Sequence, residues 1–361
     1  MQKKIIIFRT DRLGDYIIHS RPIYELKKKY SDSHIIVVCS RINKKILEKT
    51  SYIDELIEYN KDDDLLEKFK IFKLIVKHRY FASFILDGKK FSYICNYFLR
   101  SKNKYGLSYK SFKNIFFKIP IYNPSRLYNY FFFDKVEYFT SRKYLIHKES
   151  LCVKYLNLFN DLNLKLTNKD NYIFESPNEF DRIFDDLKES LNINKYVLIH
   201  FDEKWLDILN VNTQLVENIK ILQKSLNIKI ILTAYNNKFD YFLKLKSHFQ
   251  YYDSSRNEFD QISNADIIII DNLNIFFFEK FLKHSIINIS CHSGFIAQVC
   301  GANSGKILDI INQRDLNWYS CWKPENTFHK FIFKDNLNTK NDLSIIFDDI
   351  SKIVKSLYNR I

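Results

Sequence analysis

Short apolar runs alternate along the first half of the chain with longer segments whose apolar residues recur every three or four positions. The runs Ile5–Phe8 and His34–Cys39 are apolar at nearly every position, which is typical of parallel strands buried on both faces. The segment between them has helical spacing and ends in three lysines, as a helix C-terminus does. The same pattern predicts strands at Glu55–Tyr59 and Phe84–Leu86, and helices at 42–49, Leu65–Lys77 and Phe91–Arg100.

The alternation resumes near residue 180, after an amphipathic helix at His147–Leu162 and a strand and linker at 164–178. Residues 105–145 are aromatic and irregular, and no element is assigned there. The second half is predicted to hold strands at Tyr196–His200, Lys229–Thr233, Asp266–Ile270, Ile286–Ile289 and Lys306–Ile310, and helices at Glu179–Leu191, Thr213–Leu226, Ile275–Leu282, Phe295–Cys300 and Leu343–Tyr358. We therefore predict an α/β protein with two doubly wound parallel sheets.

Domain boundaries follow from this restart and from the length of 361 residues, which suits two domains of ordinary size. We place the domains at 1–175 and 176–340. The final segment, 341–361, is expected to be a helix that packs back on the first domain.

Charge is distributed unevenly between the two halves. Residues 1–150 hold 31 Lys or Arg and 16 Asp or Glu, whereas residues 151–361 hold 25 and 26. The net charge of +14 therefore lies in the first half, which favours an anionic partner such as nucleic acid, acidic lipid or an anionic glycan. A solvated lysine-rich surface is the alternative.

The remaining composition narrows the class of protein. The six cysteines are scattered without C-x-x-C spacing, which suggests reduced thiols in a cytosolic protein and no zinc or redox site. The apolar run at the start is too short for a signal peptide, and no uncharged run approaches the ~20 residues of a membrane span. Any membrane contact is expected to be peripheral.

The first candidate site is the turn after the first strand, Arg9 to Asp15. Ligands of doubly wound sheets bind outside the carboxyl ends of the strands. Gly14 allows close approach of the backbone, and Asp15 stands at or near the start of the next helix. Asp15 is either a helix cap or a ligand-facing carboxylate. No G-x-G-x-x-G pattern is present, so a dinucleotide cofactor is not indicated.

Two further candidate sites follow strands of the second half. Ser293 and Gly294 come between a strand and a helix, where free N–H groups favour a phosphate or diphosphate. His292 before them is either a ligand contact or a turn residue. After Tyr196–His200, Lys204 either neutralises a phosphate or is simply solvated, and Asp202, Glu203 or Trp205 beside it is a candidate contact to a sugar or base.

These stretches together resemble a known family. Strand–Arg-x-x-x-Leu-Gly-Asp–helix is similar to the start of glycosyltransferase family 9, which includes the lipopolysaccharide heptosyltransferases. Further similar stretches are Phe84–Gly88 with Tyr105-Gly106, Val197–His200 with Lys204-Trp205, and Ile289–Gly294 with the strand after it. The resemblance covers nearly the whole chain at low identity, and its N-terminal part is the most specific.

The resemblance implies a GT-B fold, two Rossmann-like domains facing a cleft. The first domain would bind an anionic lipid-linked acceptor, and the second a nucleotide-activated sugar. Inversion would occur without a metal or other cofactor. Asp15 would be the general base, and Lys204, Ser293 and Gly294 would bind the donor diphosphate. The donor sugar or nucleotide is assigned to His292, His200 and Trp205, and the acceptor or the turn itself to Arg9, Arg12 and Gly14.

The chain departs from the family pattern at the donor side. His292 replaces the Asp that helps to hold the donor sugar in the family, and the Pro-Gly after His200 is Phe201-Asp202. The sequence thus predicts a cytoplasmic glycosyltransferase that acts with heptose or a related sugar at the inner membrane surface, without a nucleic-acid partner. The alternatives are a non-catalytic basic module that binds nucleic acid or anionic lipid, and another GT-B enzyme such as a nucleotide-sugar epimerase.

Overall fold

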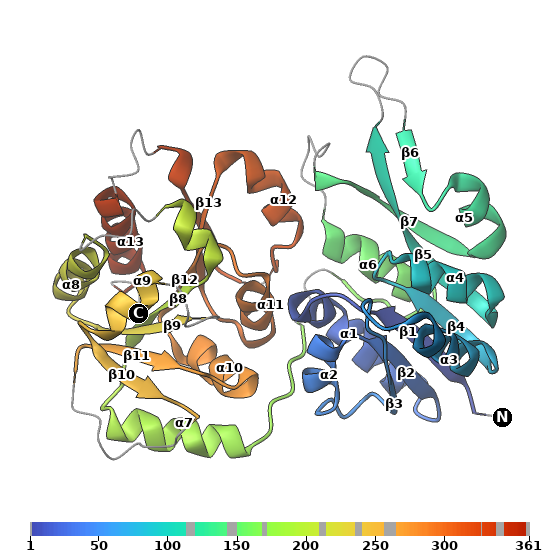
Figure 1. Ribbon diagram of the computed structural model, residues 1–361, viewed down its shortest axis with the longest axis horizontal. Coiled ribbons are helices and arrows are strands. Elements are labelled where there is room, and N and C mark those ends of the chain that lie inside the picture. The colour runs from blue at the N-terminus through green and yellow to red at the C-terminus, as the bar shows by residue number, and fades with distance from the viewer. Residues whose placement is uncertain are drawn as a thin grey trace. The chain divides into compact units, whose positions relative to one another are not determined.

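The chain forms two compact units, each built around its own sheet (Figure 1). The first unit comprises Met1–Glu175 and Asn317–Glu325, and the second comprises Ser176–Leu316 and Asn326–Ile361. The computed structural model describes residues 2–112, 120–142, 150–167, 172–208, 214–234, 240–255, 265–325, 327–336 and 343–358.

The first sheet has the strand order β3-β2-β1-β4-β5-β6, and β7 also pairs with β5. Its pairs are parallel except for the antiparallel pair β5–β6. The apolar residues of β1 are fully buried in the middle of this sheet. The strands are β1 (Lys4–Arg9), β2 (His34–Cys39), β3 (Glu55–Glu58), β4 (Arg79–Ile85), β5 (Arg100–Phe112), β6 (Pro120–Asn123) and β7 (Lys135–Thr140).

Helices cover both faces of the first sheet. On one face, Phe8 of β1 shares an apolar cluster with Ile75 of α3 and Tyr93 of α4. On the other face, Phe159 of α6 stacks on Phe84 of β4 with ring centroids 4.4 Å apart, and α1 packs on α6. The helices are α1 (Leu13–Lys29), α2 (Arg41–Leu47), α3 (Leu65–Val76), α4 (Lys90–Phe98), α5 (Arg126–Phe132) and α6 (Leu151–Asn160).

The second sheet is parallel throughout, with the order β10-β11-β9-β8-β12-β13-β14. All six residues of its central strand β8 are buried, as expected for a strand covered on both faces. The strands are β8 (Tyr196–Phe201), β9 (Lys229–Ala234), β10 (Gln250–Asp253), β11 (Ile267–Asp271), β12 (Ile287–Ser290), β13 (Ile307–Ile311) and β14 (His329–Phe333).

Alternate side chains of β8 point to different helices, because successive residues of a strand face opposite sides of the sheet. Ile199 and Phe201 join a core with α8, α9 and α13, whereas the Tyr196 hydroxyl donates a hydrogen bond to the Phe281 carbonyl of α10. The helices are α7 (Glu179–Ser190), α8 (Gln214–Leu226), α9 (Asp240–Lys246), α10 (Ile275–His284), α11 (Gly294–Asn303), α12 (Leu316–Cys321) and α13 (Leu343–Tyr358).

The predicted α/β architecture with two parallel sheets is confirmed. The expectation for the final helix is wrong, because α13 buries Ile346, Ile350 and Val354 in the core of the second unit and packs on α8. The segment Asn317–Glu325, expected in the second domain, belongs to the first unit, where Trp322 lies 6.5 Å from the ring of Tyr155.

Smaller differences concern the linkers. None of the described residues in the expected strand at 164–178 lies in a strand. The helix expected from His147 begins at Leu151, and residues 143–149 lie outside the described residues, as does the expected helix start at Thr213. Among the residues described, no helix has the length and apolar character needed to cross a bilayer.

Candidate active site

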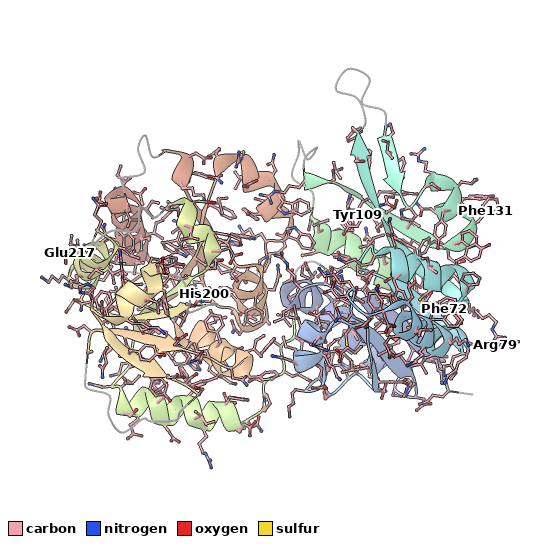
Figure 2. The ribbon with its side chains drawn as sticks, in the orientation of Figure 1. Phe72, Arg79, Tyr109, Phe131, His200 and Glu217 are labelled. Atoms are coloured by element: carbon pink, nitrogen blue, oxygen red, sulfur yellow. The ribbon has the colours of Figure 1, made fainter. Side chains whose placement is uncertain are left out.

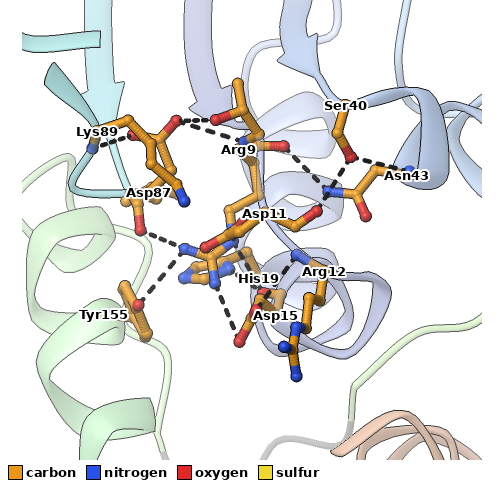
Figure 3. Close-up of polar contacts among 12 residues, drawn as sticks. Arg9, Asp11, Arg12, Asp15, His19, Ser40, Asn43, Asp87, Lys89 and Tyr155 are labelled. Carbon is orange, nitrogen blue, oxygen red and sulfur yellow. Dashed lines mark hydrogen bonds and ion pairs between the residues drawn. The ribbon is translucent and has the colours of Figure 1, made fainter. Parts of the chain in front are cut away.

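The first-unit site lies at the carboxyl ends of β1 and β4 and comprises Arg9, Asp11, Asp15 and Asp87. Arg9 is the last residue of β1 and is 1% exposed. Its guanidinium donates hydrogen bonds to the main-chain oxygens of Asp15, at 3.1 Å, and of Leu86. Figure 3 shows it enclosed by these groups. Arg9 is therefore a buried structural cation that joins the two strand ends, and its side chain is not exposed to a ligand.

Asp15 is the third residue of α1 and performs the capping role that the sequence left open. Its Oδ2 accepts a hydrogen bond from the Arg12 N–H at 3.3 Å, and its Oδ1 lies 3.7 Å from the Arg9 guanidinium. A carboxylate in the first turn also interacts favourably with the helix dipole. Its side chain is nevertheless 28% exposed. Capping and access to a ligand are thus compatible at this position.

Arg12 and Gly14 complete the turn in different ways. Arg12 is the N-cap residue of α1 with an exposed side chain, so its charge faces solvent. Gly14 is buried in the first turn of the helix. The structure brings Arg9, Arg12, Gly14 and Asp15 together, and of these four residues only Arg12 and Asp15 have side chains that are accessible to a ligand.

Asp11 is a titratable residue of this turn that the sequence reasoning missed. Its Oδ1 lies 3.1 Å from Arg9 Nε. Burial raises the pKa of Asp11 to about 7, with Asp15 and Asp87 adding to the rise and Arg9 opposing it. A carboxyl group with such a pKa exchanges a proton near neutral pH, which is the property of a general acid or base. The signal in the sequence was a second acidic residue in the same short turn.

Asp87 fixes the position of the turn. Its Oδ2 accepts hydrogen bonds from Thr10 Oγ1 at 2.6 Å and from Ser92 Oγ at 2.8 Å, and its Oδ1 accepts one from the Lys89 N–H at 3.1 Å. It therefore links the ends of β1 and β4 to the start of α4. The adjacent Gly88 has a φ of +63°, and a Cβ there would lie 2.3 Å from the Tyr109 ring. In the sequence, the Asp-Gly pair directly after a buried strand is the feature that indicates this positioning role.

The second-unit site lies at the carboxyl ends of β8, β12 and β13 and comprises His200, Lys204, His292, Ser293, Gly294 and Asp309. The register pairs Ser290 of β12 with His200 of β8 on one side and with Asp309 of β13 on the other. These polar residues thus form one row across the sheet. The loops that follow β8 and β12 carry the remaining site residues.

Asp309 is the centre of a buried hydrogen-bond network that the sequence did not reveal. Its Oδ2 accepts from His292 Nδ1 at 2.8 Å and from His329 Nε2 at 2.7 Å, and its Oδ1 accepts from Ser290 Oγ at 2.9 Å. Although burial raises the pKa of Asp309, the two histidines lower it well below its usual value. Asp309 is therefore an anion that holds both rings in place. An acidic residue inside an apolar strand was its signal.

His292 occupies the turn between β12 and α11 with a φ of +56°, a conformation uncommon for residues other than glycine. Burial lowers the pKa of His292 although Asp309 opposes this. The ring is therefore neutral at pH 7, and because the carboxylate can only accept, the ring donates its Nδ1–H. In this tautomer Nε2 is a hydrogen-bond acceptor. His292 is thus a positioned polar group and not merely a turn residue.

Lys204 connects the two loops of this site. Its Nζ donates a hydrogen bond to the main-chain oxygen of His292 and lies 3.8 Å from Asp202 Oδ2. The Lys204 side chain is 35% exposed. Burial raises the pKa of Asp202 to about 6, with Lys204 opposing it. Asp202, one of the three candidate contacts predicted after β8, is therefore a further titratable residue beside Lys204.

Ser293 and Gly294 form the start of α11. The Ser293 hydroxyl caps the helix by accepting from the Ile296 N–H at 3.5 Å. Gly294 is exposed, and a Cβ at this position would meet no atom within 4 Å. An open helix N-terminus with a lysine bonded to the residue before its cap is a suitable environment for a phosphate or diphosphate.

His200 and Trp205 are placed differently from the other predicted contacts. His200 lies inside the second unit (Figure 2). A hydrogen bond joins its Nδ1 to Thr233 Oγ1 at 2.9 Å, and burial together with Lys204 lowers its pKa to about 3. His200 is therefore a buried, neutral member of the second-unit site. Trp205 is fully buried in the apolar core, and its Nε1 donates to the His200 carbonyl at 2.9 Å. The expectation that Trp205 contacts a sugar or base is wrong in this structure, because the core covers its ring.

A search of the described part of the chain finds no group of three or more His, Cys, Asp or Glu side chains placed to hold a metal ion. The six cysteines are free thiols, and all are buried.

Comparisons with known proteins find similarity in the fold and not in the sequence. No family model matches the sequence, and no curated protein matches it significantly. Solved structures match over nearly the whole chain. A glycosyl transferase family 9 protein from Veillonella parvula is 13% identical with a TM-score of 0.69, and the match covers 99% of this chain and 98% of that one.

Two further solved structures also match this chain. E. coli heptosyltransferase WaaC, solved with ADP, is 11% identical with a TM-score of 0.64, covering 98% of this chain and 99% of that one. UDP-GlcNAc 2-epimerase from Methanocaldococcus jannaschii is 14% identical with a TM-score of 0.51, covering 97% and 92%. At these identities the likeness establishes the fold. The predicted GT-B fold is confirmed, and it is shared with a family 9 glycosyltransferase, as the N-terminal turn predicted.

Proposed function

We propose that this protein is an inverting, metal-independent glycosyltransferase. It would move a heptose or a related sugar from a nucleotide-sugar to a lipopolysaccharide core or a similar surface glycan. The observation that carries the proposal is the position of Lys204, bonded to the main chain just before α11, whose N-terminus is open at Gly294. This pair is suited to a diphosphate leaving group.

The donor side rests on fixed positive charge. As the bond between sugar and diphosphate breaks, negative charge builds up on the diphosphate oxygens. Lys204 and the N–H groups at the start of α11 are preorganised to stabilise that charge. In the proposed reaction they take the role that a metal ion has in other transferases. The likeness in fold to a heptosyltransferase solved with ADP agrees with a nucleoside diphosphate at a site of this kind.

The donor sugar would meet His292. Asp309 accepts a hydrogen bond from the ring Nδ1–H, and in that tautomer Nε2 is the ring atom that would accept a hydrogen bond from a sugar hydroxyl. A carboxylate stands at this position in the family that the sequence resembles, and it also accepts hydrogen bonds. The proposal therefore keeps a hydroxyl-bearing sugar as donor, with the acceptor atom supplied by a neutral ring instead of an anion.

The acceptor side rests on Asp15. A sugar hydroxyl is a weak acid, so it needs a base within hydrogen-bond reach as it attacks the anomeric carbon. Asp15 is part-exposed and held by the Arg12 N–H, so one of its oxygens is positioned to take that proton. Asp11, with its pKa raised to about 7, is a second carboxyl group in the same turn. Arg12 would bind an anionic group of the acceptor.

The setting of the reaction is part of the same proposal. The excess of basic residues in the first half favours an anionic lipid-linked acceptor. We place the protein in the cytoplasm, associated with the cytoplasmic face of the inner membrane, with no nucleic-acid partner.

The test is a thermal-shift panel of nucleoside diphosphates and nucleotide-sugars. A ligand that binds only the folded state raises the apparent stability by mass action, by about 2.7 kcal/mol at a hundredfold excess over Kd. One base and one sugar should stand out, and Lys204→Met should remove the shift. The proposal fails if no nucleotide shifts the midpoint while RNA does so in a salt-dependent manner, which would favour a basic binding module.

An epimerase is the second candidate, because its fold also matches over nearly the whole chain. A donor found in the panel should therefore be incubated with the protein alone. Conversion of its sugar to an epimer without any acceptor would favour that function over transfer.

A further inference from the structure

One side of the first unit carries large apolar side chains that face solvent. Tyr130 is 81% exposed, Phe131 66% and Phe98 55%. Single exposed apolar residues are ordinary on protein surfaces, but a contiguous group is not. The residues of this apolar patch, as defined here, are Leu65, Leu66, Phe69, Ile94, Tyr97, Phe98, Leu127, Tyr130 and Phe131.

The patch follows the outer sides of three helices. On α4, Ile94, Tyr97 and Phe98 are spaced as i, i+3 and i+4, so they share one helical face. On α5, Leu127, Tyr130 and Phe131 repeat the same spacing. The inner sides of α3 and α4 already pack on the sheet through Ile75 and Tyr93. A surface helix normally places polar residues on its outer side. These helices differ because they also carry large apolar residues on the side that faces solvent.

Ring contacts make the patch continuous across the helices. Phe72 of α3 lies 5.4 Å from Phe98 of α4, and Tyr97 of α4 lies 4.6 Å from Phe132 of α5, measured between ring centroids. Figure 2 labels Phe72, at one end of this series, and Phe131, the neighbour in sequence of Phe132 at the other end. The three helices therefore present one surface and not three separate ones.

The same stretch of chain is strongly basic. Residues 65–132 contain 14 Lys or Arg but only two acidic residues, Glu67 and Asp87. Asp87 is buried in the first-unit site, and Glu67 is paired with Lys70 at 2.9 Å. The exposed cations Lys70, Lys73, Lys77, Lys89, Lys90 and Arg126 lie on these helices and at their ends, whereas Asp62, Asp63 and Asp64 precede the N-terminal end of α3.

We propose that the apolar patch and its surrounding cations bind the surface of an anionic lipid bilayer. Aromatic and aliphatic side chains enter the boundary between headgroups and acyl chains, where Tyr is favoured, and the cations contact anionic headgroups. A second copy of this chain fits less well, because its patch would bring the same excess of positive charge. The bilayer is the partner that satisfies both the apolar and the basic character of the surface.

The position of α4 links this surface to the first-unit site. The helix begins at Lys90, directly after the Lys89 N–H that is bonded to Asp87, and its outer side then runs into the patch. A protein bound through α3, α4 and α5 thus holds the carboxyl end of β4 close to the lipid surface. The inference rests on the membrane location that forms part of the proposed function, and it names the face responsible.

The experiment is flotation of the full chain with vesicles, without donor or acceptor. The vesicles contain phosphatidylglycerol and phosphatidylcholine in equal parts, or phosphatidylcholine alone. We expect at least about tenfold tighter binding to the anionic vesicles, weakened by salt, since each basic residue near the surface favours binding by about fivefold. The variant carrying Leu127→Ser, Tyr130→Ser and Phe131→Ser should lose at least about tenfold of this affinity.

The matched control replaces three exposed apolar residues of the second unit, with Ile221→Ser, Leu243→Ser and Ile345→Ser. It should bind the vesicles as the unmodified chain does. All three proteins are also measured for folding by circular dichroism and for the nucleotide-induced thermal shift. These readouts separate the two proposals, because vesicle binding needs no donor and the thermal shift needs no membrane.

Two results overturn the inference. The first is the absence of vesicle binding, or binding that the α5 variant leaves unchanged. The second is a dimer in light scattering that the α5 variant converts to a monomer, without affinity for lipid, since this would assign the patch to a second copy of the chain.

Discussion

The two sheet edges that carry the candidate sites have the same architecture and opposite electrostatics. In the first unit, Asp11 and Asp15 lie against one buried cation, Arg9, and Asp87 is bonded to the adjacent Thr10. In the second unit, Lys204 and an open helix N-terminus lie at the edge that also holds Asp309, whose buried carboxylate accepts hydrogen bonds from His292 and His329. In both units the ends of the strands fix where the polar groups lie. The loops that follow these strands decide the chemistry, because they provide carboxylates at the first edge and a lysine with a helix N-terminus at the second.

This difference matches the two halves of a group transfer. A proton must leave the attacking hydroxyl, which needs a carboxylate, and charge must be stabilised on the departing diphosphate, which needs cations and N–H donors. Burial acts in opposite directions on an acid and a base: it raises the pKa of Asp11 to about 7 at the first edge, and together with Lys204 it lowers that of His200 to about 3 at the second.

The largest expected effect comes from removing the proposed base, Asp15, of the first-unit site. Asp15→Asn keeps a side chain that can cap α1 but loses the carboxylate, so kcat/KM should fall about 1,000-fold. The Kd of the nucleotide measured by calorimetry should stay within about twofold, since donor binding belongs to the other edge.

Two variants sharpen this result. Asp64→Asn changes a helix cap on α3, where Oδ1 accepts from the Glu67 N–H at 2.7 Å, and should leave turnover unchanged. If Asp11→Asn reduced turnover more than Asp15→Asn, the base would be Asp11, and the assignment of Asp15 would be wrong.

A smaller effect is expected from neutralising the second-unit site. Lys204→Met should weaken nucleoside diphosphate binding by about 10- to 100-fold, because a charge-assisted hydrogen bond contributes about 1.5–3 kcal/mol. Titration calorimetry measures this directly. Lys220→Met, which removes an exposed lysine of α8, is the control and should bind normally. Equal affinity of both variants would contradict a diphosphate site at Lys204.

The smallest effect concerns the pH dependence of stability. The folded-state pKa of His200 is lowered to about 3, so its contribution to stability is present at pH 7 and is lost as the pH falls below about 6.5. The pKa of Asp202 is raised to about 6, so its contribution is present below about pH 4 and is lost as the pH rises to 6. Between pH 4 and 6 the two slopes oppose each other, each at about 1.4 kcal/mol per pH unit.

Urea unfolding across this range separates the two residues. Asp202→Asn should make the chain more sensitive to acid by about 1.4 kcal/mol per pH unit, and His200→Gln should make it less sensitive by the same amount. His248→Gln, which replaces an exposed histidine, is the control for the loss of a histidine elsewhere in the second unit. Parallel curves for all three variants would show that the two buried groups do not titrate as described.

The site was predictable where it follows a strand end in one continuous stretch. Arg9 to Asp15 and His292 to Gly294 are such stretches, and the structure places both at carboxyl edges of their sheets. Residues that act across the sheet were not predictable. Asp309 and His329 join His292 only because β12, β13 and β14 are neighbours, and strand order is not encoded in local periodicity. Trp205 looked like a ligand contact until its complete burial was known.

The sequence by itself determined the alternation of buried strands and helices, the two-part division of the chain and the charge excess of the first half, because each depends on residues close together in the chain. Only the tertiary structure decided that α13 completes the core of the second unit, that Asn317–Glu325 joins the first, and which apolar side chains stay exposed on α3, α4 and α5. Helical periodicity identifies an apolar face, but whether that face meets a sheet or solvent depends on the neighbours that folding brings to it.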